Sequence, residues 1–373
     1  MTRTRDEELL LEAVALAQRG RTWVEPNPRV GAIASRAGVV VGSGWHETFG
    51  GPHAEVTALA EARGRGERPD TVHVTLEPCS TPQGSAGKKT PPCTEALRAA
   101  GVRRVVFGAA DPDPRHAGRA AAELRAAGIA VEGPLLPGEC GALLGPFQRG
   151  LALDRPWTLA KWAMTLDGKI ATVTGSSRWV SGEESRRRAH ALRASCDAVV
   201  VGWRTVEADD PELTVRHVPG RQPVRVVVDP EAAIDDDCRL LRTARAHPLW
   251  LLVAEDADAA VCGRLADAGA RVVHCPRRAL RRLDLASAWR ELRARGMRRV
   301  LVEGGGGLVA ELLAARCVDQ LVAFVAPKLV GGRAAPTPVG GDGFASMDQA
   351  LRVADLHVAA SGEDLLVDGY LQD

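Results

Sequence analysis

The residues best suited to chemistry lie in the stretch Pro52-His53-Ala54-Glu55 and at two later cysteines, Cys79 and Cys93. One histidine and two cysteines can hold a Zn²⁺ ion and leave its fourth position open, which is the arrangement of a catalytic zinc site. Zinc lowers the pKa of a bound water to about 7 and so supplies hydroxide at neutral pH. We expect His53, Cys79 and Cys93 to be metal ligands and Glu55 to be the catalytic group that moves protons.

Each of these residues also has an ordinary structural interpretation. A lone histidine is usually structural, a lone cysteine usually packs in a core, and Glu55 could simply be a glutamate at a helix N-terminus. A histidine, any residue and a glutamate, followed later by Pro-Cys, resemble the signature of zinc-dependent base deaminases. Cys79 and Cys93 are fourteen positions apart, farther than in that signature. The coincidence of three candidate ligands around one acidic residue favours the metal site.

The elements that must position these residues alternate between strands and helices, which predicts a layered α/β domain with parallel pairing. We expect helices at 6–19, from 53, at 93–100 and at 118–127, a hairpin at 30–45, and strands at 72–76, 104–108 and 129–132. In such folds, sites lie at strand carboxyl ends and helix N-termini. His53 and Glu55 would begin one helix, Cys79 would follow a strand, and Cys93 would begin another helix.

Length and composition limit the class of protein. The chain has 373 residues, is 45% hydrophobic and has a net charge of +1, which predicts two or three globular domains and argues against a membrane or nucleic-acid partner. A deaminase of nucleic acid with an accessory domain is one alternative, but the 4% aromatic content offers few stacking platforms. Residues 1–7 lack the apolar core of a secretory signal, and the eight scattered cysteines predict a reducing cytoplasm. We expect a cytoplasmic homo-oligomer, a dimer or tetramer, that acts on a small molecule.

A second α/β pattern begins after a boundary at 154–156, so we expect domains at 1–150 and 156–373. A helix over 138–153 would lead into the linker. Strands are expected at 158–163, 198–202, 224–229, 249–254, 271–274, 299–303 and 320–325, a closing antiparallel pair at 351–357 and 365–371, and helices at 183–194, 257–268, 283–295 and 308–315. The glycine run 304–307 follows a strand and precedes a helix. It could bind phosphate at the helix N-terminus or could be only a tight turn.

The N-terminal motifs together resemble the bifunctional riboflavin-biosynthesis deaminase/reductase family. They are Pro-Asn-Pro-x-Val-Gly at 26–31, His46, His-Ala-Glu at 53–55, Thr-Leu-Glu-Pro-Cys at 75–79, Thr-Pro-Pro-Cys at 90–93 and Asp-Pro-Asp-Pro at 111–114. The resemblance implies a cytidine-deaminase-like three-layer domain that hydrolytically deaminates a diaminopyrimidinone ribosyl phosphate. It implies substrate contacts by Asn27, His46 and Lys89, although Asn27 between two prolines could belong only to a stiff turn.

Two departures from that family motivate an alternative, a monofunctional reductase whose first domain is only structural. The segment 82–88 is longer than its family counterpart, and Thr81 stands where many members carry a histidine. The small, turn-forming residues of the insertion predict a surface bulge. We therefore expect the departures to affect substrate contacts more than zinc binding.

The segments 161–171, 176–181 and 202–216 resemble the reductase half of the same family. The resemblance implies a dihydrofolate-reductase-like domain in which NADPH delivers hydride to the ribose carbonyl carbon and gives a ribityl group. The implied NADPH contacts are Ala163, Trp179, Thr205, Asp209, Gly305, Gly306, Gly307 and Glu311, and the implied substrate contacts are Ser177, Arg193, Leu213, Arg216 and Glu303. Arg193 and Arg216 are forked cations suited to phosphate. Either Lys161 or Asp209 could act as the catalytic acid that protonates the alkoxide, and the sequence leaves both open.

Overall fold

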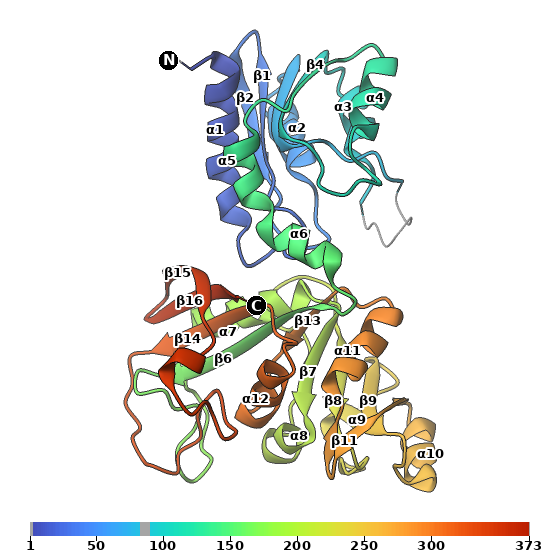
Figure 1. Ribbon diagram of the computed structural model, residues 1–373, viewed down its shortest axis with the longest axis vertical. Coiled ribbons are helices and arrows are strands. Elements are labelled where there is room, and N and C mark those ends of the chain that lie inside the picture. The colour runs from blue at the N-terminus through green and yellow to red at the C-terminus, as the bar shows by residue number, and fades with distance from the viewer. Residues whose placement is uncertain (1–2, 83–89, 373) are drawn as a thin grey trace. The chain divides into compact units, whose positions relative to one another are not determined.

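The computed structural model describes residues 3–82 and 90–372, which divide into two compact units, Met1–Leu153 and Asp154–Asp373 (Figure 1). No helix within those described ranges has both the length and the apolar character needed to cross a bilayer.

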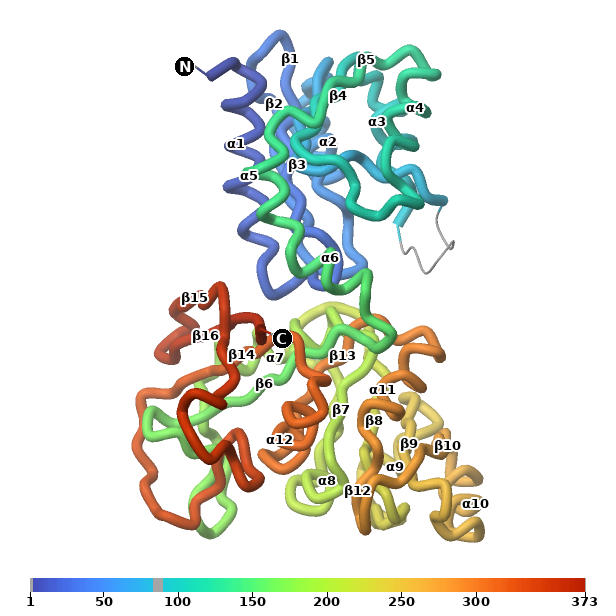
Figure 2. Tube along the Cα trace, viewed as in Figure 1, coloured from blue at the N-terminus to red at the C-terminus, as the bar shows by residue number. Residues whose placement is uncertain are grey.

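The first unit is built on a five-stranded sheet of order β2-β1-β3-β4-β5 (Figure 2). Its strands are β1 (Gly31–Arg36), β2 (Val39–Trp45), β3 (Thr71–Leu76), β4 (Arg104–Ala109) and β5 (Ala130–Glu132). The parallel pairing expected from the sequence holds for β3, β4 and β5, whereas β1 runs antiparallel to both neighbours. The antiparallel part is the expected hairpin.

Helices cover both faces of this sheet and make the three layers. Helices α1 (Arg5–Ala17) and α5 (Pro137–Gly141) pack on one face, and α2 (Ala54–Gly64), α3 (Cys93–Ala99) and α4 (Arg119–Ala126) form a layer on the other. Two glycines permit the close approach. A Cβ on Gly31 would lie 2.0 Å from the carbonyl oxygen of Ala13 in α1, and a Cβ on Gly42 would lie 2.3 Å from that of Ala58 in α2.

The prediction of a single helix over 138–153 is wrong. The segment forms α5, a 3-10 turn η3 (Ala142–Leu144) and α6 (Gly145–Ala152). Pro146 lies in the first turn of α6, where its missing N–H and ring favour the start of a helix over its interior.

The second unit contains a nine-stranded sheet of order β10-β9-β8-β7-β13-β6-β14-β16-β15. Its strands are β6 (Trp157–Thr165), β7 (Ala198–Gly202), β8 (Val224–Val228), β9 (Leu249–Ala254), β10 (Arg271–Cys275), β13 (Arg299–Val302), β14 (Gln320–Ala326), β15 (Val353–Ser361) and β16 (Asp364–Leu371). The strands from β10 to β14 are parallel, and β16 and β15 close the sheet antiparallel to β14 and to each other. A small hairpin of β11 (Arg277–Ala279) and β12 (Arg282–Leu283) follows β10.

Six helices of the described chain connect these strands: α7 (Glu183–Ala194), α8 (Trp203–Asp209), α9 (Arg239–Arg242), α10 (Ala259–Asp267), α11 (Leu285–Ala294) and α12 (Gly306–Ala314). The sequence pattern did not predict α8, which ends where Asp210 adopts a left-handed φ of 38°. A continuous core of Val, Leu and Ala side chains around the buried Trp289 joins the strands to α11 and α12.

Candidate active sites

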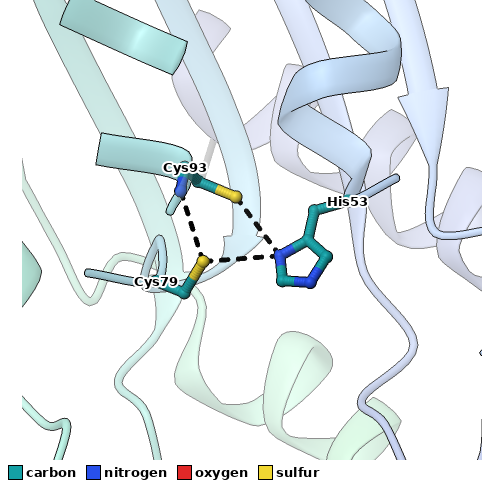
Figure 3. A group of neighbouring side chains, drawn as sticks. All are labelled: His53, Cys79 and Cys93. Atoms are coloured by element: carbon teal, nitrogen blue, oxygen red, sulfur yellow. Dashed lines mark hydrogen bonds between the residues drawn. The ribbon is translucent and has the colours of Figure 1, made fainter. Parts of the chain in front are cut away.

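Three element ends place the predicted metal ligands of the first unit together (Figure 3). His53 is the extended residue that precedes α2, Cys79 follows β3, and Cys93 is the first residue of α3. Their candidate ligand atoms all lie within 4.8 Å of one another, and His53 Nδ1 is 3.5 Å from Cys79 Sγ and 3.2 Å from Cys93 Sγ. Zn–S and Zn–N bonds of about 2.3 and 2.0 Å in a tetrahedral site put neighbouring ligand atoms about 3.5–3.8 Å apart. The donor set therefore fits zinc.

Contacts around the cluster fix its members. The other ring nitrogen of His53, Nε2, lies 3.2 Å from Thr90 Oγ1. The backbone N–H of Cys93 donates to Cys79 Sγ at 3.3 Å, and that of Thr94 donates to the Cys79 carbonyl at 3.2 Å. An N–H that donates to sulfur favours the thiolate, which is the form that binds metal.

Glu55 lies in the first turn of α2 and is 3% exposed. Burial raises the pKa of the Glu55 carboxyl, the charge of His53 acts against this rise, and Cys79 adds to it. A bound cation would lower the same pKa. A carboxyl subject to these opposed influences can change protonation state during a reaction near neutral pH.

Asn27 and His46 lie beside the metal ligands. The His46 ring contacts the His53 ring edge-on, with centroids 5.3 Å apart. His46 Nδ1 lies 2.8 Å from the carbonyl oxygen of Pro52, to which it must donate. His46 Nε2 then accepts from the Asn27 amide at 3.2 Å. This chain of contacts sets the orientation of the Asn27 side chain at the candidate site.

Other predicted and unpredicted residues complete the surroundings. Lys89 and the inserted residues 83–88 lie outside the described part of the chain. Thr81 Oγ1 is 3.2 Å from His116 Nδ1. Sequence reasoning assigned Glu77 no role, but its buried carboxylate accepts the backbone N–H groups of Gly118 and Ala121 at 2.9 and 3.2 Å. Glu77 thereby ties the segment that carries Cys79 to the start of α4.

In the second unit, Lys161, Arg193 and Glu303 form a partly buried cluster. Glu303 Oε1 accepts from Arg193 Nε at 2.5 Å, Glu303 Oε2 accepts from Arg193 Nη2 at 3.0 Å, and Lys161 Nζ lies 3.4 Å from the same Oε2. Burial alone would raise the pKa of Glu303, but the charges of Arg193 and Lys161 hold that pKa well below its usual range. The carboxylate therefore stays ionised and keeps two cations in place.

The structure gives the Arg193 guanidinium more hydrogen-bond partners than the sequence suggested. Besides Glu303, its Nη1 donates to the carbonyl of Thr214 at 3.1 Å. Arg216 is about half exposed, and its guanidinium donates to Glu212 at 2.6 Å and to Thr214 Oγ1 at 3.1 Å. Arg193 and Arg216 thus both contact Thr214, and Arg216 is the more accessible of the two cations. Their binding of a substrate phosphate stays a prediction.

Two further predicted substrate contacts lie in loops. Leu213 is buried with a left-handed φ of 56°, a conformation that a leucine rarely adopts and that is enriched at functional sites. Ser177 is half-buried and precedes α7.

Four predicted NADPH contacts line one cavity of about 420 Å³: Thr205, Gly305, Gly307 and Glu311. Gly305 N donates to Thr205 Oγ1 at 3.2 Å and so joins the start of α12 to α8. No described atom lies within 4 Å of a Cβ built on Gly307, so this glycine opens the cavity beside a helix N-terminus. The cradle fits the phosphates of a dinucleotide. Gly306 instead packs against the chain, because its Cβ would meet the carbonyl of Thr337 at 2.5 Å.

The remaining predicted residues of this half are not among the cavity's lining residues. Ala163 lies on β6 opposite Phe324. Trp179 is 63% exposed, and the Arg186 guanidinium lies 4.5 Å from its ring centre. Asp209 ends α8 with an exposed side chain, and nothing in the described chain joins it to Lys161 by a hydrogen bond or ion pair.

Sequence reasoning missed three arginines that line the same cavity, Arg204, Arg281 and Arg282. The sequence carries 48 lysines and arginines, so no pattern distinguished these three from solvated surface.

Two family models together match most of the chain. Residues 3–109 match the cytidine and deoxycytidylate deaminase zinc-binding region, and residues 156–367 match the RibD C-terminal domain. The riboflavin biosynthesis protein RibD of Actinobacillus pleuropneumoniae is 38% identical over 97% of this chain and 94% of its own length. The protein of the same name from Aquifex aeolicus is 38% identical over 98% and 99%.

Solved structures agree over the whole length. Acinetobacter baumannii RibD superposes with a TM-score of 0.71 at 30% identity and covers 99% of both chains. A Thermotoga maritima diaminohydroxyphosphoribosylaminopyrimidine deaminase/5-amino-6-(5-phosphoribosylamino)uracil reductase gives 0.69 at 31% identity with the same coverage. The expected fold class, a deaminase-like unit followed by a RibD reductase unit, is confirmed.

Proposed function

The chain belongs to the RibD family of riboflavin-biosynthesis proteins, and we propose that its two units catalyse two successive steps of that pathway. The first is hydrolytic deamination of 2,5-diamino-6-(ribosylamino)pyrimidin-4-one 5′-phosphate. The second is NADPH-dependent reduction of the ribosyl group to ribityl. The main support for two activities in one chain is the cluster of His53, Cys79 and Cys93 beside the buried Glu55, in the same chain as a reductase unit.

Residues of the first unit have separate roles in deamination. When bound by His53, Cys79 and Cys93, zinc supplies Lewis-acid activation of water at neutral pH. Glu55 takes a proton from the attacking water and delivers it to the ring nitrogen and the leaving ammonia. Asn27, oriented by His46, presents its amide to the polar pyrimidine ring. Lys89 is proposed from the family resemblance to meet the substrate phosphate.

In the second unit, bound NADPH supplies a hydride to the ribose carbonyl carbon. We assign protonation of the resulting alkoxide to Lys161, because Lys161 is partly buried and held beside Glu303, whereas the Asp209 side chain is exposed at the end of α8. Arg216 and Arg193 bind the substrate phosphate, with Ser177, Leu213 and Glu303 shaping the site. Ala163, Trp179, Thr205, Asp209 and the turn from Gly305 to Glu311 contact the cofactor.

One rival to this proposal is a monofunctional reductase. The longer segment between the cysteines motivated that rival, but the ligand atoms of His53, Cys79 and Cys93 converge despite it. We place deaminase activity in residues 1–150 and reductase activity in 156–373.

We also propose a cytoplasmic homo-oligomer, a dimer or tetramer. No disulfide joins any of the eight cysteines, all of which lie in the described part of the chain, and this suits a reducing compartment. Edge strand β15 exposes Val353, Leu356 and Val358, and an apolar sheet edge favours self-association. Light scattering of the purified protein measures the oligomeric state, and a monomer would refute this part.

The direct test supplies the purified protein with the diaminopyrimidinone ribosyl phosphate, with and without NADPH. Ammonia should be released in both cases, and NADPH should be oxidised in step with the appearance of the ribityl product. Reduction of the deaminated compound without any release of ammonia from its precursor would establish the monofunctional reductase instead.

A further inference from the structure

The substrate segment (residues 213–216), which carries the proposed substrate contacts Leu213 and Arg216, belongs to no helix or strand of the second unit. Leu213, Thr214 and Val215 are buried, whereas Arg216 is exposed. Buried peptide groups outside regular structure need hydrogen-bond partners from other parts of the chain. The side chains that supply these partners therefore fix the point from which the Arg216 side chain extends.

Two side chains hold the middle of the substrate segment. Gln222 Oε1 accepts the backbone N–H of Val215 at 2.8 Å, and Gln222 Nε2 donates to the Val215 carbonyl at 2.9 Å. Arg193 Nη1 donates to the carbonyl of Thr214 at 3.1 Å. These side chains thus take the place of the backbone partners that a strand would have.

His190 holds the end of the substrate segment. It lies on α7, is 6% exposed, and its Nδ1 accepts the backbone N–H of Arg216 at 3.2 Å. Burial and nearby positive charges lower the pKa of His190 to about 4. The charged groups that face it are Arg193, His217 and Arg216, which lower this pKa, and Glu303, which raises it. His190 is therefore uncharged near neutral pH, and its Nδ1 carries no proton and can accept.

Helix α7 links the substrate segment to the groups proposed for catalysis. His190 and Arg193 are three positions apart on α7, so they lie on the same face of the helix. Arg193 also donates to Glu303, which faces Lys161, the proposed proton donor. One helix face thus sets the backbone at Arg216 relative to the proton donor. Because both groups must act on one substrate molecule, a small displacement of either would weaken its contact.

We propose that His190 and Gln222 are positioning residues of the reductase unit: they hold the backbone of the substrate segment so that Arg216 meets the substrate phosphate. This inference rests on the proposed reductase function and adds to it two residues that touch neither substrate nor cofactor. Their contribution passes through the backbone of the segment, so it is seen as substrate affinity.

The test measures steady-state NADPH oxidation by the full-length protein with the deaminated ribosyl phosphate. His190→Leu removes the acceptor and leaves an apolar side chain. The KM for this substrate should rise about 3- to 10-fold, because the N–H of Arg216 loses its partner. The kcat and the KM for NADPH should stay at their wild-type values. With the same substrate lacking its phosphate, the variant and the wild type should have equal KM.

Two further variants sharpen the result. His190→Asn places an amide oxygen near the position of Nδ1 and should restore most of the substrate affinity. Gln222→Met, at an exposed position that does not endanger folding, removes both hydrogen bonds to Val215 and should raise the same KM about threefold. An unchanged KM in Gln222→Met, or in a folded His190→Leu, would overturn the proposal.

Coupling to Arg216 separates positioning from a general structural effect. If His190 acts through Arg216, adding His190→Leu to Arg216→Ala should raise the KM little beyond that of Arg216→Ala alone. Independent effects would multiply instead. A double variant whose KM rises by the product of the two single effects would therefore overturn the proposal.

Ser185→Ala is the matched control. Ser185 is a buried residue of the same helix, its hydroxyl donates to Ser361 Oγ at 2.9 Å, and no hydrogen bond within the described ranges joins it to the substrate segment. Its KM for the substrate should equal that of the wild type, and a rise as large as that in His190→Leu would overturn the proposal. Each of these contrary results leaves the reductase function standing. A wild-type protein that oxidises no NADPH with the deaminated substrate would refute the reductase function and this proposal with it.

Discussion

The two units position their reactive groups in different ways. In the first, His53, Cys79 and Cys93 come from three element ends and converge within 4.8 Å, so one ion can organise the site. In the second, Lys161 lies on β6, while the cavity with four predicted NADPH contacts is lined by other elements, including the hairpin turn that carries Arg281. The first site depends on a few short distances, and the second depends on the order of strands in the sheet. Damage to one site should therefore leave the other site's chemistry intact.

The largest expected effect comes from Glu55→Gln. This variant should retain zinc, because the three ligands remain, but lose about 10²- to 10⁴-fold in deamination because the proton carrier is gone. Ammonia release and zinc content measure the two properties, and NADPH oxidation with the deaminated substrate should not change. Glu95→Gln is the matched control. Glu95 lies two residues after Cys93, just as Glu55 lies two residues after His53, but the Glu95 side chain is exposed whereas that of Glu55 is buried. Deamination at the normal rate in Glu55→Gln would show that Glu55 is misassigned.

Glu303→Gln should destabilise the second unit. Loss of the carboxylate leaves Arg193 and Lys161 as largely buried cations without their counter-ion, which costs up to about 3–5 kcal/mol in the free energy of unfolding. Chemical denaturation followed by tryptophan fluorescence measures the change, because six of the eight tryptophans lie in the second unit. Trp23 and Trp45, in the first unit, serve as the internal reference. Glu311→Gln, which breaks only an exposed pair with Arg282, should change stability by about 1 kcal/mol or less. Equal effects of the two substitutions would contradict the buried-cluster account.

Thr90→Val should weaken zinc binding while the fold is kept. With Nδ1 of His53 facing the two sulfurs, Nε2 must carry the proton and donate it to Thr90 Oγ1. Loss of such a partner of a metal-binding histidine lowers metal affinity about 10- to 100-fold. Competition with a chromophoric chelator measures the affinity, and Thr90→Ser should restore most of it.

The control for that experiment is Thr94→Val. Thr94 follows Cys93 directly, and its buried hydroxyl has no hydrogen-bond partner in the described chain. Its zinc affinity should therefore match the wild type. A loss of affinity in Thr94→Val as large as that in Thr90→Val would indicate a general packing effect.

Arg216→Ala should have the smallest effect of the set. Loss of an accessible phosphate contact should weaken substrate binding about tenfold and leave NADPH binding nearly unchanged. Arg187→Ala, at an exposed position on α7, is the control. A larger loss for NADPH than for substrate would refute the phosphate role of Arg216.

The same difference between the units explains what could be foreseen from the sequence. His53, Cys79 and Cys93 could be grouped because the ends of neighbouring strands and helices in an α/β layer meet at one edge. The strands of both sheets were expected near their observed positions, since strand periodicity and turn residues are local signals. The break between α5 and α6 and the short helix α8 were missed, because a proline in a helical pattern and a seven-residue helix give weak local signals.

Contacts between residues far apart in the sequence could not be predicted from such local signals. Arg193 looked like a solvated cation on a charged helix, and only the fold brings Glu303, 110 positions away, against its guanidinium. Arg204 and Arg281 are separated by β8, β9 and β10 along the chain, so no spacing rule connects them. Thr90 belongs to a recognised motif, but its contact with His53 Nε2 requires the ring orientation that the structure supplies.

Removal of zinc tests the central claim most directly. The protein is treated with a strong chelator, and ammonia release from the diaminopyrimidinone substrate and NADPH oxidation with its deaminated product are followed side by side. Two independent sites in one chain predict that ammonia release stops and returns when Zn²⁺ is added, while NADPH oxidation continues throughout. Ammonia release that persists without the metal would contradict the account.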